Sequence, residues 1–168
     1  MSPLAVSTVF LAAILVLCIV RPRAGRWFVG LFFLAMGLGV NLTFVLRDPS
    51  QFVALGTAEP LVPLYAAFFE QVVGRAPVLW GLLVVAFQLV VGVLLLGRGP
   101  SVRWGLAGAT VFLLAITPLG PWTLANPLLA VALATLWRRP HDASLLDAVR
   151  GASRSARRNG DGHEKRAS

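Results

Sequence analysis

The chain has 168 residues, of which 57% are hydrophobic and 13% are charged, and its net charge is +8. The charged share is about half of that in soluble globular domains. This composition excludes a disordered chain and speaks against a soluble enzyme, because a small soluble fold needs more charge to cover its surface. The apolar residues form long runs, which is typical of an all-α protein embedded in a lipid bilayer.

Five apolar runs predict a polytopic bundle of five transmembrane helices within residues 1–140. The runs cover about residues 4–20, 27–46, 78–97, 104–119 and 122–137. The second and third each contain about 20 residues, enough to cross roughly 30 Å of hydrocarbon as a helix. The first run is expected to stay as a helix instead of being a cleaved signal peptide, because no basic residue precedes it.

The last two runs are expected to form a tight helical hairpin. No charged residue stands between Arg103 and Arg138. One straight helix of that length would reach roughly 50 Å, which is too long for a bilayer. Pro118 and Pro121 break the stretch near its middle, where the hairpin is expected to turn.

The long connection between the second and third runs has a helical pattern of its own. Apolar residues recur at helical spacing through residues 61–74, whereas Glu70 and Arg75 lie toward the other side. Pro60 and Pro63 fit the start of a helix. We therefore expect a short amphipathic helix at 61–74 that lies on the membrane surface.

Basic residues alternate between the connections and predict an orientation. The first and third connections carry net charges of +3 and +2, the second carries −1 and the fourth carries none. Because basic loops stay in the cytoplasm, the N-terminus is expected outside and the C-terminus inside. The richness in Ala, Gly and Arg points to a bacterium, and hence to the plasma membrane.

The composition changes after Pro140, and residues 141–168 are expected to form a basic, largely disordered cytoplasmic tail. Residues 144–150 have enough apolar character for two helical turns on the membrane surface. The basic residues of the body lie at the ends of apolar runs and not on one face of a soluble fold, which speaks against a nucleic-acid partner. The expected partner is the lipid bilayer, while a second membrane protein and the oligomeric state stay open.

Three amide side chains lie inside the predicted spans, namely Asn41, Gln88 and Asn126. Polar groups at membrane depth are costly and often functional. One interpretation is that the three converge on a small polar pocket, which binds a head group or a quinone carbonyl. The simpler interpretation is hydrogen bonding between helices, worth about 0.6–2 kcal/mol each. Asn126 precedes a proline, so a third interpretation is that it caps the last helix.

No catalytic or metal-binding constellation stands out in the sequence. The spans contain no Asp, Glu, Lys or His, which argues against an ion-coupled transporter. His141 and His163 both lie in the tail, apart from other metal ligands. The sequence thus predicts no catalytic residue, no metal and no resident cofactor, and it favours a protein that is not an enzyme.

Two segments resemble the DoxX-like small integral membrane proteins. The first is RWFVGLFFLAMG at 26–37, with its arginine, its glycines and its Phe-Leu stretch, and the second is FQLVVGVLLLG at 87–97. The resemblance covers about residues 26–137 and implies a four-helix core, to which the first span is an addition. The family often has a glutamate where Gln88 stands and a lysine near the position of Asn41, so this chain departs from the family pattern at both.

Three functions stay open at this point. The first is an accessory or scaffold subunit of a membrane complex, without a catalytic site. The second is a redox accessory subunit that interacts with quinone. It is implied by the resemblance, because some DoxX-like proteins are linked to quinone-coupled oxidation of sulfur compounds or to redox homeostasis. The third is a carrier of a small solute or a lipid. A fold alone does not decide between them.

Overall fold

The computed structural model describes residues 2–151, and their regular structure is entirely helical. The α-helices are α1 (Pro3–Val20), α2 (Pro22–Ala35), α3 (Leu42–Arg47), α4 (Ser50–Thr57), α5 (Pro63–Gln71), α6 (Pro77–Leu96), α7 (Ser101–Ile116) and α8 (Asn126–Trp137). The shorter elements are the π-helix η1 (Met36–Asn41), the 3-10 helices η2 (Val73–Arg75), η3 (Thr117–Leu119) and η4 (Pro121–Thr123), and a helix at 145–151. The all-α prediction is confirmed for this part of the chain. The predicted disordered tail beyond residue 151 lies outside the described residues.

Three helices are long and apolar enough to cross a membrane, namely Pro22–Arg47, Pro77–Leu96 and Ser101–Leu119. The first of these joins α2, η1 and α3 into one continuous helix of 26 residues. The first and last predicted spans correspond to shorter apolar helices, Leu4–Val20 and Pro121–Trp137. By length and composition, the described residues thus contain three helices that could each span a membrane.

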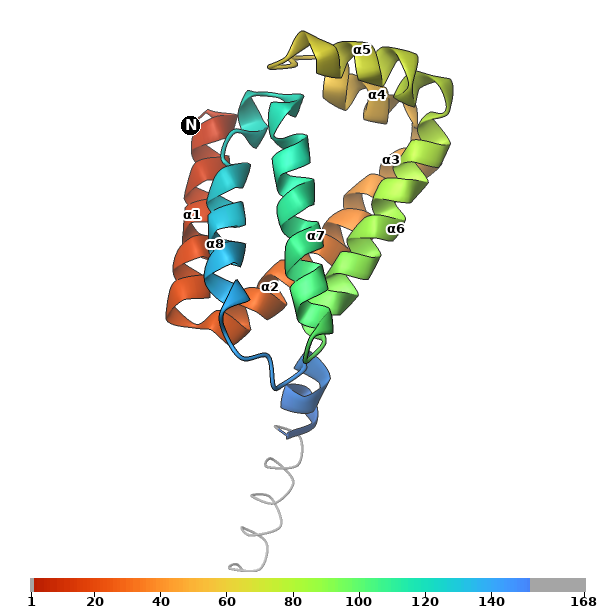
Figure 1. Cartoon of the computed structure of the whole chain (residues 1–168). Coiled ribbons are helices and arrows are strands. Elements are labelled where there is room, and N and C mark those ends of the chain that lie inside the picture. Colours follow the sequence, from red (N-terminus) through yellow and green to blue (C-terminus); the bar gives the residue numbers. More distant parts are fainter. Residues whose placement is uncertain (1, 152–168) are drawn as a thin grey trace, which may run out of the picture.

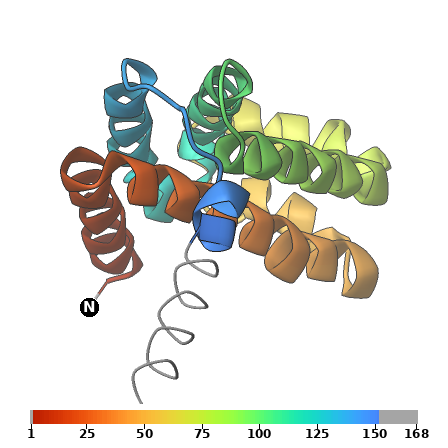
Figure 2. The same ribbon diagram turned by 90° about the horizontal axis from the view of Figure 1, so that it is seen from below.

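The helices form two arms that meet at one end of the molecule and diverge at the other (Figure 1). One arm holds α1, α7 and α8 side by side, and the other holds α3 and α6. Helix α2 connects the arms, because it starts beside α1 and then runs along α6, as the view from below also shows (Figure 2). Helices α4 and α5 lie across the far end of the second arm (Figure 1).

Helices α2 and α6 cross at two glycines. A Cβ atom added to Gly92 would lie 2.9 Å from the Gly30 carbonyl oxygen and 2.7 Å from the Leu34 side chain. A Cβ atom on Gly30 would lie 3.1 Å from the Gly92 carbonyl oxygen. The two backbones thus approach too closely for a larger side chain, which is a common way for membrane helices to pack.

The connection between α3 and α6 differs from the sequence prediction. The sequence predicts no helix at 50–57, where α4 lies. The helix predicted at 61–74 corresponds to α5, which ends at Gln71 and is followed by η2. The reason is tertiary contact, because Phe69 of α5 lies against Gly56 of α4, where an added Cβ would overlap the ring. Such a contact between two short segments leaves no periodic pattern in the sequence.

Asp48 fixes the start of α4. Its carboxylate accepts hydrogen bonds from the Ser50 backbone N–H at 3.1 Å and from the Gln51 side chain at 2.9 Å. The Ser50 hydroxyl also donates to it. These donors, the Ser50 hydroxyl first, hold the pKa of Asp48 below its usual value. The charged form therefore accepts hydrogen bonds from the first turn of α4, where the helix dipole favours a negative charge.

The glycine crossing leads to a prediction about stability. Gly92→Ala is expected to lower the free energy of unfolding in detergent by about 1–3 kcal/mol, because the new methyl group overpacks the contact with α2. Thermal unfolding monitored by circular dichroism measures the effect. Gly39→Ala is the matched control, since a Cβ there meets nothing within 4 Å. An equal effect of the two substitutions would contradict the role of the crossing.

Candidate functional site

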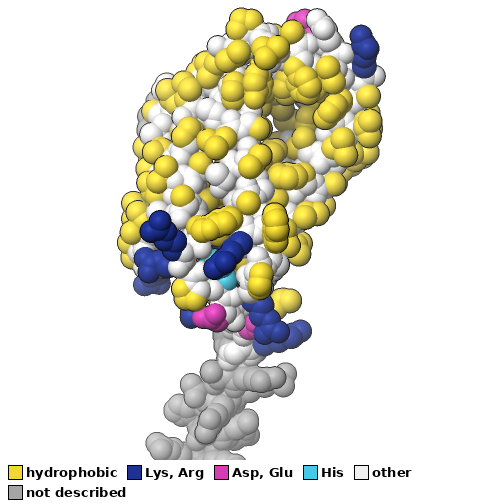
Figure 3. Space-filling view, viewed as in Figure 1, with side chains coloured by type: hydrophobic (Ala, Val, Ile, Leu, Met, Phe, Trp, Pro, Cys, Tyr) yellow, Lys and Arg dark blue, Asp and Glu magenta, His cyan; other side chains and the backbone are white. Residues whose placement is uncertain are grey.

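A cavity of about 350 Å³ lies between the two arms. Its walls come from both arms and from α4 and α5, and they are rich in aromatic side chains, including Phe32, Phe33, Phe52, Phe69, Trp80 and Phe112. The space-filling view shows a hollow between the two arms, rimmed by hydrophobic side chains (Figure 3). Cavities of this size that are mostly apolar with a few polar groups are typical of small-molecule sites.

All three amide side chains singled out in the sequence line this one cavity. They are Asn41 on η1, Gln88 on α6 and Asn126 on α8, and each is buried. The Asn41 Nδ2 donates a hydrogen bond to the Gln88 Oε1 at 2.6 Å. Hydrogen bonding between helices is therefore the right interpretation for this pair, and the pair also faces the cavity.

The π-helix η1 places Asn41 at the cavity. In η1 the backbone N–H of Leu42 donates to the carbonyl of Gly37, five residues earlier. Such π segments occur mostly as single turns within α-helices and are frequent at functional sites. Gly37 also makes room for the pair, because a Cβ on it would lie 3.3 Å from the Gln88 Cβ.

Asn126 has a different role from that pair. It is the first residue of α8, the cap position belongs to Ala125, and no side chain makes a capping hydrogen bond there. The interpretation of Asn126 as a helix cap is therefore wrong. Its Nδ2 has no hydrogen-bond partner among the described residues, although the residue is only 8% exposed. A buried donor without a partner is rare in a folded protein and needs an explanation.

Three threonine hydroxyls in α7 and the turn that follows bind backbone groups. The Thr110 and Thr117 hydroxyls donate to carbonyls four residues earlier in their own helix. Thr123, which no sequence pattern marks, is buried in the turn between α7 and α8. Its hydroxyl donates to the Thr117 carbonyl at 2.7 Å and accepts from the Gly120 N–H at 3.1 Å. This network replaces the backbone hydrogen bonds that the prolines of the turn remove.

None of the residues lining the cavity is charged. Within residues 2–151, no group of three or more His, Cys, Asp or Glu side chains lies in metal-binding proximity. The polar groups of the lining are the three amides, the Ser7 hydroxyl and the indoles of Trp80 and Trp122, none of which titrates near neutral pH. The arrangement is thus suited to holding an uncharged molecule, and it offers no general acid or base.

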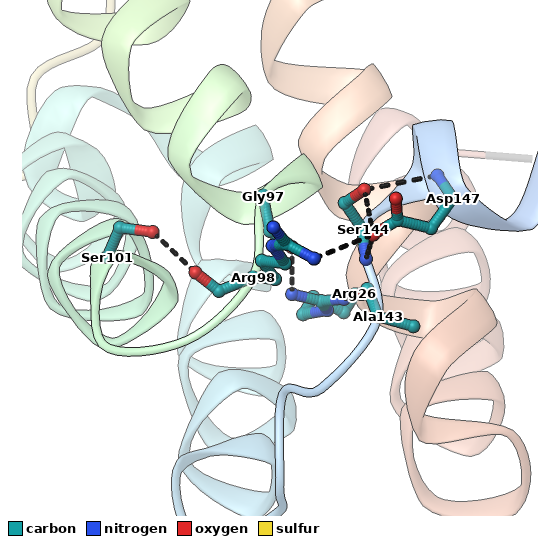
Figure 4. Close-up of polar contacts among 7 residues, drawn as sticks. All are labelled: Arg26, Gly97, Arg98, Ser101, Ala143, Ser144 and Asp147. Atoms are coloured by element: carbon teal, nitrogen blue, oxygen red, sulfur yellow. Dashed lines mark hydrogen bonds and ion pairs between the residues drawn. The ribbon is translucent and has the colours of Figure 1, made fainter.

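A second polar cluster lies at the end where the arms meet (Figure 4). Arg26 is only 2% exposed, and its guanidinium donates to the Gly97 carbonyl at 2.8 Å and to the Ala143 carbonyl at 2.6 Å. The Gly97 carbonyl lies at the C-terminal end of α6, where the helix dipole favours a positive charge. Arg26 therefore ties α2 to the end of α6 and to the segment after α8. Arg26 opens the segment that resembles the DoxX-like proteins, but its charge predicted a place in the connection before the second span and no buried contact.

The segment after α8 is fixed by further contacts. The Gly99 N–H, in a turn where Gly99 has a φ of +71°, donates to the His141 carbonyl at 2.8 Å. Burial, together with the charges of Arg26 and Arg103, lowers the pKa of His141. This end of the bundle is thus closed by the two hydrogen bonds of the Arg26 side chain and by the backbone hydrogen bond from Gly99 to His141.

Ser144 caps the helix at 145–151. Its hydroxyl donates to Asp147 at 2.7 Å and accepts from the Asp147 backbone N–H at 3.1 Å (Figure 4). The donation from Ser144 holds the pKa of Asp147 below its usual value. Arg98 lies 3.7 Å from the same carboxylate, but both side chains are exposed, so the ion pair adds little.

Comparison with protein-family models, with curated proteins and with solved structures finds no match. The resemblance to the DoxX-like proteins therefore depends on the two sequence segments alone.

The two amide arrangements predict opposite effects on stability. Asn41→Leu is expected to lower the free energy of unfolding by about 1–3 kcal/mol, because it leaves the Gln88 amide without its partner. Asn126→Leu is expected to raise the free energy of unfolding, because the substitution removes a buried donor that has no hydrogen-bond partner. Thermal unfolding of delipidated protein in detergent compares the two. Destabilisation by both substitutions to the same extent would contradict this assignment.

Proposed function

We propose that this chain is a multi-pass integral membrane protein that binds an uncharged, lipophilic small molecule in the cavity between its two arms. The observation that supports this most strongly is the unpartnered amide of Asn126 in an aromatic cavity, where a ligand acceptor would complete its hydrogen bonding. The Asn41–Gln88 pair offers further donors and acceptors on the opposite wall. The predicted accessory or scaffold role needs no such cavity, so ligand binding is the better-supported function.

The lack of charged side chains in the lining favours a ligand without charge, because a buried charge needs a partner. A quinone ring meets this requirement, since its carbonyl oxygens accept hydrogen bonds from amides. A redox accessory subunit that interacts with quinone, as the DoxX-like resemblance implies, is one form of the proposal. Carriage of a small solute or an uncharged lipid is the other form, and it shares the same site.

Binding of an uncharged ring ester, methyl 4-hydroxybenzoate, tests the proposal. We expect the protein to bind it in detergent, and we expect Asn126→Leu and Gln88→Leu each to weaken binding about three- to tenfold, since each removes one hydrogen bond. Isothermal titration calorimetry gives the Kd. Gln71→Leu is the matched control, because this amide lies on α5 outside the cavity. Equal affinities of all variants would contradict the proposal.

The proposed topology has five spans, with the N-terminus outside and the C-terminus in the cytoplasm of a bacterium. Helix α1 has 18 residues, so it reaches about 27 Å, close to the thickness of the hydrocarbon core. Basic side chains gather at the end where the arms meet (Figure 3), and the turns between α1 and α2 and between α6 and α7 lie there too (Figure 1). This clustering supports the positive-inside assignment.

Reporter fusions test the orientation. Alkaline phosphatase fused after Arg98 or after Arg139 is expected to be inactive, because both sites lie at the basic, cytoplasmic end. A fusion after Glu59, in the connection between α4 and α5, is expected to be active. High activity after Arg98 or Arg139 would overturn the orientation, and low activity after Glu59 would overturn the span count.

A further inference from the structure

A second hollow lies beside the cavity, between α5 and the end of α7, and is here called the α5/α7 groove. It has a volume of about 480 Å³. Four residues line both the groove and the cavity, namely Phe68, Phe69, Ile116 and Leu119. The two spaces are therefore neighbours that share one apolar wall.

The groove offers apolar surface but no free hydrogen-bonding side chain. Tyr65 has the single polar side chain among its lining residues, and its hydroxyl donates to the Ala115 carbonyl at 2.6 Å. The outer lip is open, since Leu64 is 73% exposed. An occupant of the groove would gain burial of apolar surface without any polar contact.

Helix α5 covers the groove only loosely. None of its residues is buried. Tyr65 bonds to α7, and just before α5 the Leu61 N–H donates to the Pro118 carbonyl of η3 at 3.1 Å. The shared wall includes Phe68, which is 42% exposed, so rotation of this side chain would join the two spaces.

We propose that the ligand is a head-and-tail molecule, whose uncharged ring sits in the cavity and whose alkyl or prenyl tail leaves through the α5/α7 groove. This inference depends on the proposed function and adds the class of ligand to it. The cavity provides the polar contacts that a head requires, and the adjoining groove provides the purely apolar surface that a tail requires. A phospholipid does not meet this description, because its charged head would find no partner in the cavity.

Two esters with the same ring test whether the tail lies in the α5/α7 groove. Methyl 4-hydroxybenzoate has the head alone, and dodecyl 4-hydroxybenzoate adds a long alkyl tail. Ala115→Trp fills the groove but does not touch the cavity, because Ala115 lines the groove alone. We expect this variant to bind the dodecyl ester about tenfold or more weakly than the wild type, with the methyl ester unchanged. Titration calorimetry in one detergent compares the Kd of the variants with that of the wild type for each ester. Partitioning of an ester into micelles is the same for every variant, so it does not affect this comparison.

Val111→Trp is the matched control, since Val111 lies one turn earlier on α7, is exposed and lines neither space. Leu64→Trp fills the groove from the opposite wall and is expected to repeat the effect of Ala115→Trp, so the test does not depend on one variant. If both groove variants bind the dodecyl ester as the wild type does, the tail leaves elsewhere and the inference is wrong, while the proposed function stands. If neither ester binds the wild type, the proposed function itself fails.

Discussion

The close contact between Gly30 and Gly92 is the constraint on which the rest of the structure depends. It brings the α2 and α6 backbones together, so that a Cβ on Gly92 would lie 2.9 Å from the Gly30 carbonyl oxygen. Because α2 also packs against α1, it links the two arms at one end of the molecule. The arms diverge from there (Figure 1), and the cavity occupies the space between them. A looser crossing would let the arms collapse onto each other or separate.

Charge and polarity are divided between the ends and the middle of the molecule. Arginines gather where the arms meet, and Arg26 there is buried against two backbone carbonyls. The cavity between the arms contains amides and aromatic rings and no charged side chain. Such a division suits a protein that recognises an uncharged molecule at membrane depth, because binding there needs hydrogen bonds but no change of protonation.

The sequence predicts the features that depend on local composition. Apolar runs predicted the helices, and a polar residue in an apolar run is visible at once, so Asn41, Gln88 and Asn126 could be found. The sequence did not reveal α4, because its packing depends on a contact with α5. It also did not reveal that Arg26 is buried, since its partner carbonyls lie 71 and 117 residues away. The unpartnered state of the Asn126 amide likewise depends on three-dimensional surroundings that no local pattern encodes.

The central claim is that the cavity holds an uncharged lipophilic molecule through its amides. Native mass spectrometry of protein taken from its membrane into lipid nanodiscs tests it most directly, with wild type and Gln88→Leu side by side. We expect one uncharged lipophilic adduct per wild-type chain and a clearly lower occupancy in the variant. A wild type without an adduct, or an identical adduct in both proteins, would contradict the account.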